Sequence, residues 1–193
     1  MNLQYPLILA SNSPRRKQLL AQAGFEFTVQ TFPVEENYPA TMPVADIAGY
    51  LAAKKADAFQ GNITNQLVLT ADTTVLVDDD MFAKPANEAE AAAMLRRLSG
   101  RSHLVMTGIC LMDQGVKTVQ ADTTEVVFRT LTEAEITHYV QTYKPYDKAG
   151  AYAIQEWIGM VGITKIVGSH FNVVGLPLHL VYAMLTPYMQ QKH

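Results

Sequence analysis

The feature that most constrains the fold is the stretch of residues 67 to 85, in which apolar, β-branched runs surround an acidic residue. The runs 67–69 and 74–77 are typical of buried strand, and Asp72 interrupts them. Burying an ionised carboxylate without a partner costs several kcal/mol, so we expect Asp72 to lie at a cleft and to meet a metal, a cation or a proton. The alternative is an aspartate that hydrogen-bonds nearby backbone at a strand end.

Strands and helices are expected to alternate along the rest of the chain. Strands are predicted at 7–11, 25–31, 102–113, 116–128, 159–167 and 171–174, with a hairpin at Gln114-Gly115 and another turn at 78–80. Helices are predicted at 14–23, 43–59, 88–99, 133–143 and 177–189, from capping residues, prolines and glycines at their ends. This order predicts a mixed α/β fold. Segment 147–155 shows neither the hydrophobic period of a helix nor that of a strand, and it is expected to be a loop at a functional site.

Length and charge narrow the classes of protein. A chain of 193 residues is expected to form one domain, or two small lobes that share a sheet. Because 15 Lys and Arg face 18 Asp and Glu, we expect no nucleic acid partner. No apolar run approaches the roughly 20 residues that span a bilayer, so we expect no membrane partner and a cytoplasmic location. The single Cys110 is expected to be buried and inert.

An anion site is expected where the first strand turns into the first helix. Ser11 and Ser13 precede Arg15 and Arg16 in the first helical turn, where the helix dipole disfavours cations. A phosphate held by both arginines and the free N–H groups of the helix end would remove that conflict. The alternative is two solvated arginines that nearby acids balance.

Scattered acids and lysines complete the candidate site. Magnesium prefers one or two carboxylates with waters and phosphates, so Glu36 and Asp72 would suffice, although Glu36 could equally be a surface residue. Three lysines lie beside helix ends or loops, where lysines are usually solvated: Lys55, Lys84 and Lys148. Taken together, cations for a polyphosphate, acids for a metal and an aspartate that activates water predict metal-assisted hydrolysis of a phosphoanhydride.

At these residues the chain resembles the Maf family of nucleoside triphosphate pyrophosphatases, over almost its whole length. The resemblance rests on Leu9-Ala-Ser-Asn-Ser-Pro-Arg-Arg16, Val34-Glu-Glu36, Leu51-Ala-Ala-Lys-Lys55-Ala, Ala71-Asp-Thr73, Lys84-Pro85, Leu98-Ser-Gly100, Asp147-Lys-Ala-Gly-Ala-Tyr-Ala-Ile-Gln155 and Val174-Gly-Leu-Pro177. It implies an inosine-triphosphatase-like α/β fold with a mixed, elongated sheet flanked by helices and two lobes around a cleft. It also implies a homodimer, a divalent metal (Mg, Mn or Co), and cleavage of a nucleoside triphosphate to monophosphate and pyrophosphate.

The resemblance also assigns roles to single residues. It matches Asp72 to the proton acceptor, and Glu36, Lys55 and Lys84 to charged positions around metal and phosphates. The positions that match its specificity residues are Arg15, Thr73 and Gln155. The chain differs from relatives at Asn12, often Gly or Gln, and at Glu156-Trp157, where small residues are usual.

The choice of base stays open at the level of the residues. The Ala-Ile-Gln155 form resembles the branch acting on dTTP and UTP, whereas the 7-methyl-GTP branch has Glu at that place. A glutamine amide matches the N3–H and O4 edge of uracil or thymine, and a flipped amide matches cytosine equally well. The alternatives are a modified-purine pyrophosphatase of the same fold, a phosphatase that releases single phosphates, and a nucleotide-binding regulator of cell division with little turnover.

Overall fold

The computed structural model describes residues 1–190. Within them, strands and helices follow one another in an α/β order. The strands are β1 (Leu7–Leu9), β2 (Thr28–Val29), β3 (Leu67–Val77), β4 (Asp80–Phe82), β5 (Ser102–Asp113), β6 (Val116–Phe128) and β7 (Ile163–Val167). The α-helices are α1 (Pro14–Gln22), α2 (Val44–Asp57), α3 (Glu88–Leu98), α4 (Glu133–Tyr143), α5 (Trp157–Gly162), α6 (His170–Val174) and α7 (Leu178–Leu185). Two short 3-10 helices, η1 (Ala149–Ala151) and η2 (Thr186–Tyr188), complete the set.

The strands form a mixed sheet, which confirms the predicted fold class. Its order over the described residues is β2-β1-β3-β5-β6-β7, and β4 pairs with β3 outside that path. Strand β1 runs parallel to β2 and to β3, with Ile8 opposite Thr28 and Val68. Strands β3 and β4 are antiparallel, as are β6 and β7. None of the helices in residues 1–190 is long and apolar enough to cross a membrane.

The chain divides into two compact units, each built from separate stretches of sequence. Of the described residues, unit 1 holds 1–72, 107–122 and 175–190, and unit 2 holds 73–106 and 123–174. The division falls inside β3, β5 and β6. Each unit is described below by itself.

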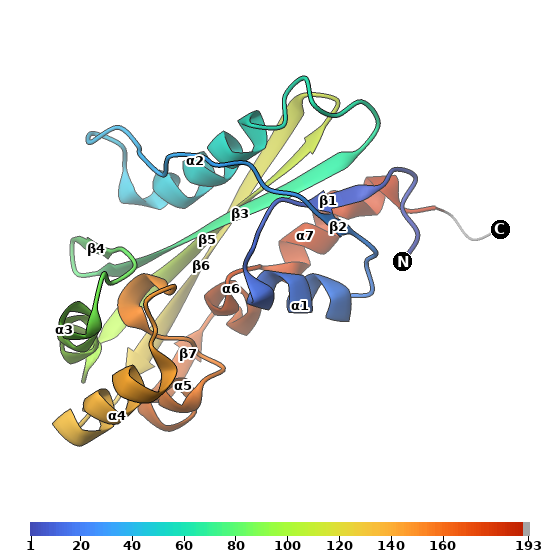
Figure 1. Ribbon diagram of the computed structural model, residues 1–193. Helices are drawn as coiled ribbons and strands as arrows, with labels where there is room; N and C mark the ends of the chain where they lie inside the picture. The colour runs from blue at the N-terminus through green and yellow to red at the C-terminus, as the bar shows by residue number, and fades with distance from the viewer. Residues whose placement is uncertain (191–193) are drawn as a thin grey trace. The chain divides into compact units, whose positions relative to one another are not determined.

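In unit 1 the link from β1 to α1 has the predicted form. The Ser13 side chain accepts a hydrogen bond from the Arg16 N–H, Pro14 is the first helical residue, and Gly24 follows the helix with φ 81°. At Gly108, β5 lies directly against α2, because a Cβ atom there would be 2.3 Å from the Ala48 carbonyl carbon. The segments at residues 4 and 188 lie side by side, since the Gln4 N–H donates to the Tyr188 carbonyl at 2.8 Å (Figure 1).

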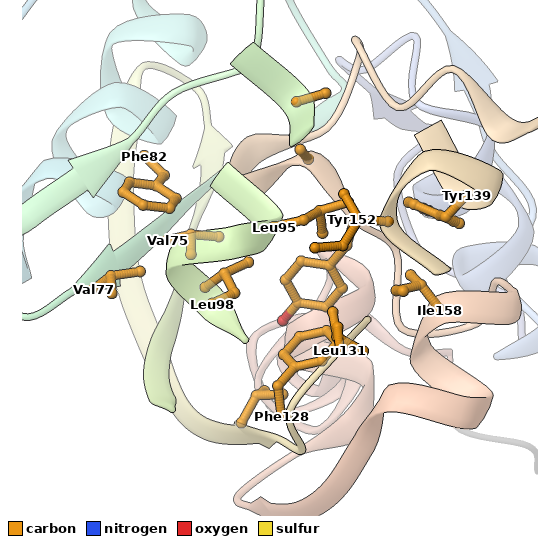
Figure 2. Close-up of a cluster of buried hydrophobic side chains, with 14 of the residues drawn as sticks. Val75, Val77, Phe82, Leu95, Leu98, Phe128, Leu131, Tyr139, Tyr152 and Ile158 are labelled. Atoms are coloured by element: carbon orange, nitrogen blue, oxygen red, sulfur yellow. The ribbon is translucent and has the colours of Figure 1, made fainter. Parts of the chain in front are cut away.

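Unit 2 has its own apolar core. Figure 2 shows the ring of Tyr152 beside Phe128 and Leu131, with Leu95 and Leu98 close by. These side chains are all buried, and the Tyr152 and Phe128 rings meet edge to face with centroids 5.2 Å apart. The capping box of Thr132 and Glu135 is present at the start of α4. The segment before residue 157 is therefore anchored to a packed core.

The structure corrects the prediction for the chain around Asp72. Strand β3 continues through residues 67–77, so Asp72 lies within a strand and not at a break or a strand end. The backbone hydrogen bonds of the sheet do not depend on side-chain polarity, so an acidic side chain is compatible with the strand if its charge meets a cation.

Other predicted strands are wrong in part. The strand expected at 25–31 is only Thr28–Val29, and the one expected at 159–167 is helix α5 followed by β7. The segment expected as a strand at 171–174 lies in helix α6, where the Ser169 side chain accepts from the Asn172 N–H. In α5 the Gly159 N–H donates to the Glu156 carbonyl, which closes the first helical turn. The hydrophobic period of a short apolar run does not tell a strand from a buried helix. In these two segments the local hydrogen bonds select the helix.

Candidate active site

Three charged side chains of unit 1 meet at one point. The Nζ atom of Lys55 lies 2.5 Å from Oδ1 of Asp72 and 2.8 Å from Oε1 of Glu36. Lys55 is in the last turn of α2, Asp72 is in β3, and Glu36 is in the loop before α2. The structure therefore brings together three of the residues that sequence predicts for the site.

Burial differs among these three side chains. The exposed fraction of the side chain is 11% for Asp72, 18% for Lys55 and 46% for Glu36. The Asp72 carboxylate is thus largely removed from water, and the Lys55 ammonium offsets the cost of its charge. Glu36 lies at the solvent side of the cluster. Glu35, its neighbour, is exposed and accepts from the Asn37 side chain at 3.1 Å.

Arg16 ties the turn between β1 and α1 to the chain next to Asp72. Its Nε donates to the Gly175 carbonyl at 2.8 Å, and its Nη1 donates to the Ala71 carbonyl at 2.9 Å and to the Ser11 Oγ at 3.4 Å. Burial lowers the pKa of Arg16 from its ordinary value, and the charge of Asp72 acts in the opposite direction. The guanidinium thus fixes the backbone that carries Asp72.

The serines of the same turn accept backbone hydrogen bonds. Ser11 Oγ accepts from the Ser13 N–H at 3.2 Å, and Ser13 Oγ caps α1. Arg15 is half-buried in the first turn of α1, and its charge contributes to the lowered pKa of Arg16. Asn12, where the chain differs from its relatives, donates to the Thr31 hydroxyl at 3.3 Å.

The remaining predicted site residues lie in unit 2. Thr73 follows Asp72 in β3 and is half-buried, whereas Lys84 is exposed in the segment after β4. Gln155 is exposed two residues before α5 begins, between the buried Ile154 and Ile158. Trp157, the bulky residue after it, places its ring against that of His138 with centroids 4.9 Å apart.

Lys148 is the buried member of this set, with a residue exposure of 8%. Its Nζ lies 2.7 Å from Oδ1 of Asp147 and 3.3 Å from Oε1 of Glu156. The other Glu156 oxygen accepts a hydrogen bond from the Tyr139 hydroxyl. Sequence reasoning noted Glu156 only as a departure from relatives, and it missed Tyr139, because nothing in a helical apolar pattern shows where a buried hydroxyl points.

Residues 1–190 contain no group of three or more His, Cys, Asp or Glu that could hold a metal ion, but unit 1 supplies two carboxylates. Magnesium takes one or two carboxylates and completes its shell with waters and substrate phosphates. Oxygens of Glu36 and Asp72 both contact Lys55 Nζ, so the two carboxylates face the same cation. These two carboxylates fit a magnesium-type ion.

The geometry of unit 1 suits chemistry on a phosphoanhydride. An ionised carboxylate that is largely excluded from water can accept a proton, and adjacent cations and a helix N-terminus can hold phosphate oxygens. The same arrangement could also bind a nucleotide without reaction. Comparison with known proteins separates these possibilities.

The comparisons point to one family. Residues 6–188 match the model of a family described as Maf-like protein. A dTTP/UTP pyrophosphatase of Phocaeicola vulgatus is 47% identical over 94% of this chain and 95% of its own length. Proteins of the same name are 45% identical in Bacteroides thetaiotaomicron, over 94% of this chain and 95% of their own length, and 48% identical in Cytophaga hutchinsonii, over 89% and 79%. The chain belongs to the Maf family.

Proposed function

We propose that this protein hydrolyses dTTP and UTP to the nucleoside monophosphate and pyrophosphate with the help of a divalent metal. Relatives that are 45–48% identical to this chain bear the name dTTP/UTP pyrophosphatase. The structural observation that carries the proposal is the contact of Asp72, Lys55 and Glu36 in unit 1. A module that only binds nucleotide has no need of a largely buried carboxylate, which repels phosphate unless a cation intervenes.

Asp72 acts as the proton acceptor in this proposal. A water molecule attacks phosphorus as the anhydride bond between the α- and β-phosphates breaks, pyrophosphate leaves, and the water proton passes to the Asp72 carboxylate. Lys55 orients that carboxylate before substrate arrives, since its Nζ contacts Oδ1 at 2.5 Å. Arg16 fixes the residue before Asp72, because its guanidinium donates to the Ala71 carbonyl.

Glu36 and Asp72 would hold the metal ion. A bound divalent ion supplies positive charge against the phosphate oxygens. Lys55 then has a second role, because its ammonium contacts both carboxylates in the free enzyme and holds them near one another.

The other predicted residues bind the substrate. In unit 1, Ser11, Ser13, Arg15 and Arg16 surround the N-terminus of α1, where backbone N–H groups favour a phosphate. In unit 2, Thr73, Lys84 and Lys148 contribute polar and cationic groups, and the exposed Gln155 amide pairs with the base. The homodimer, the identity of the metal and the cytoplasmic location remain predictions from the resemblance and the composition.

The experiment is a substrate panel scored for product. Wild-type protein is incubated with dTTP, UTP, CTP, GTP and 7-methyl-GTP, with Mg²⁺ or EDTA, and pyrophosphate and orthophosphate are measured separately. With Mg²⁺ present, we expect dTTP and UTP to yield pyrophosphate. With EDTA, we expect them to yield none. Orthophosphate as the sole initial product would refute the reaction. A preference for 7-methyl-GTP would favour the modified-purine alternative, and negligible turnover with tight binding would favour a regulator.

A variant of Asp72 tests its role. Asp72→Asn keeps the shape and removes the charge, so kcat should fall about 10²–10⁴-fold while UTP still binds. The matched control is Asp57→Asn, which removes an equally close ion pair with Lys117 on the surface of the same unit. The control should keep wild-type kcat. Near-normal kcat in Asp72→Asn would refute its role as proton acceptor.

A further inference from the structure

One hydroxyl group in unit 2 braces both ends of the segment that carries Gln155. The Tyr139 oxygen accepts a hydrogen bond from the Ala153 N–H at 3.2 Å. The same hydroxyl donates to a carboxylate oxygen of Glu156. Tyr139 therefore holds the residues two before and one after Gln155.

Glu156 links this brace to a buried cation. Its second carboxylate oxygen lies 3.3 Å from Lys148 Nζ. Lys148 is at 8% exposure and also contacts Asp147. In this network the Lys148 ammonium compensates the charge of Glu156 inside the unit, which leaves Glu156 fixed between a hydroxyl and a cation.

Tyr139 is packed into the core of unit 2. Tyr139 is fully buried in α4, belongs to the core cluster of unit 2, and its ring stacks on Tyr143 with centroids 4.9 Å apart. Burial and the neighbouring Glu156 raise the pKa of Tyr139 well above its ordinary value, so the hydroxyl keeps its proton and stays a donor.

The residue between the braced positions is free to meet a ligand. Gln155 is exposed, and its side chain has no hydrogen-bond partner within residues 1–190. Ile154 and Ile158 on either side are buried in the core. The segment thus presents one amide to solvent from a backbone held by Tyr139 and Glu156.

We propose that Tyr139 and Glu156 are positioning residues that fix the Gln155 backbone so that its amide selects a uracil or thymine edge. The proposal rests on the proposed function, which assigns the base to Gln155. A base-reading amide discriminates only if its donor and acceptor are held in place, because a mobile or flipped amide accepts cytosine as well. The brace restrains the backbone from which that amide extends, and so limits the positions from which the amide can meet a base.

The test compares Tyr139→Phe with Tyr143→Phe. Both variants remove one hydroxyl from α4 and keep the ring. Of these two hydroxyls, that of Tyr139 has hydrogen-bond partners and that of Tyr143 has none within residues 1–190. In Tyr139→Phe we expect faster hydrogen exchange of the peptide that contains Ala153 and Gln155, without nucleotide. We also expect kcat/KM to fall about tenfold for UTP and dTTP, mainly through KM, with a smaller fall for CTP. Tyr143→Phe should behave as wild type.

A second background separates positioning from general loss of stability. If Tyr139 acts through Gln155, adding Tyr139→Phe to Gln155→Ala should change kcat/KM for UTP less than twofold. Should Tyr139→Phe fold poorly, Glu156→Gln takes its place, because it keeps the shape and weakens the contact with Lys148. Unchanged exchange, an equal fall for UTP and CTP, or the full effect in the Gln155→Ala background would overturn the inference. Absence of wild-type turnover would instead refute the proposed function.

Discussion

Removing the Lys55 ammonium should destabilise unit 1, and the structure sets the size of the effect. Lys55→Met keeps most of the side-chain length but leaves the Asp72 carboxylate, at 11% exposure, without its cation. Breaking a fully buried ion pair by removing one partner costs about 3–5 kcal/mol. Because Lys55 is 18% exposed and Glu36 is 46% exposed, we expect about 2–3 kcal/mol here. For a chain of this length that corresponds to a fall in Tm of about 4–12 °C.

The assay is thermal unfolding by calorimetry in EDTA. The control is Lys117→Met, which breaks an ion pair of the same length, 2.5 Å, with Asp57. Both partners are more exposed, at 29% and 45%, so the control should lose less than about 1 kcal/mol. The double variant Lys55→Met with Asp72→Asn should regain more than half of the lost stability, since it no longer holds an uncompensated carboxylate.

Metal addition gives a second readout of the same interaction. If Glu36 and Asp72 hold a divalent ion, Mg²⁺ should raise the Tm of Lys55→Met more than that of wild type, because the ion replaces the missing charge. The reasoning is refuted if Lys55→Met melts as wild type, or if the double variant is no more stable than the single one. Equal Mg²⁺ shifts in both proteins would refute the assignment of the metal to these carboxylates.

Three further variants test other parts of the molecule. Burial lowers the pKa of His103 to about 4, so the unfolded chain binds the extra proton and stability should fall as pH drops from 6.5 to 4, by about 1.4 kcal/mol per pH unit. When the free energy of unfolding is measured with denaturant at each pH in this range, it should depend less steeply on pH in His103→Phe than in wild type. Arg16→Lys cannot reproduce the fork of hydrogen bonds to Gly175 and Ala71, so kcat/KM for UTP should fall about tenfold in steady-state assays. Gln155→Glu replaces a donor by acceptors, and its UTP/GTP ratio of kcat/KM should drop below that of wild type.

Turn and capping chemistry made much of the fold predictable. The Gln114-Gly115 turn gave the bounds of β5 and β6 correctly, and the Asn87 cap and the capping box of Thr132 and Glu135 located α3 and α4. These signals work because the hydrogen bonds that they predict are local: the Asn87 side chain accepts from the N–H of Glu90, three residues on. A prediction that depends on neighbours in sequence needs no knowledge of the tertiary structure.

The C-terminal third of the chain was harder to predict, because its structure depends on contacts that are not local in sequence. A strand was predicted at 159–167, but residues 157–162 fold as α5 and only Ile163–Val167 form the strand β7. A Cβ at Gly159 would lie 2.0 Å from the Ile154 carbonyl oxygen, so this helix depends on a close backbone approach that glycine alone permits. That contact is visible only once the chain before it has been placed.

The candidate site shows where charge in a sequence is informative and where it misleads. Arginines at a helix N-terminus indicated a missing anion, but the structure resolves part of that conflict with carbonyl oxygens, because Arg16 donates to Gly175 and Ala71. An aspartate in an apolar strand indicated a missing cation, and Lys55, 17 residues earlier, supplies it. Sequence thus tells that a buried or misplaced charge must have a partner, since the energetic cost is local, but it does not tell which partner, since the fold chooses among all groups of opposite polarity. For that reason the comparison of Lys55→Met with the double variant Lys55→Met and Asp72→Asn tests the pairing itself, which sequence alone does not specify.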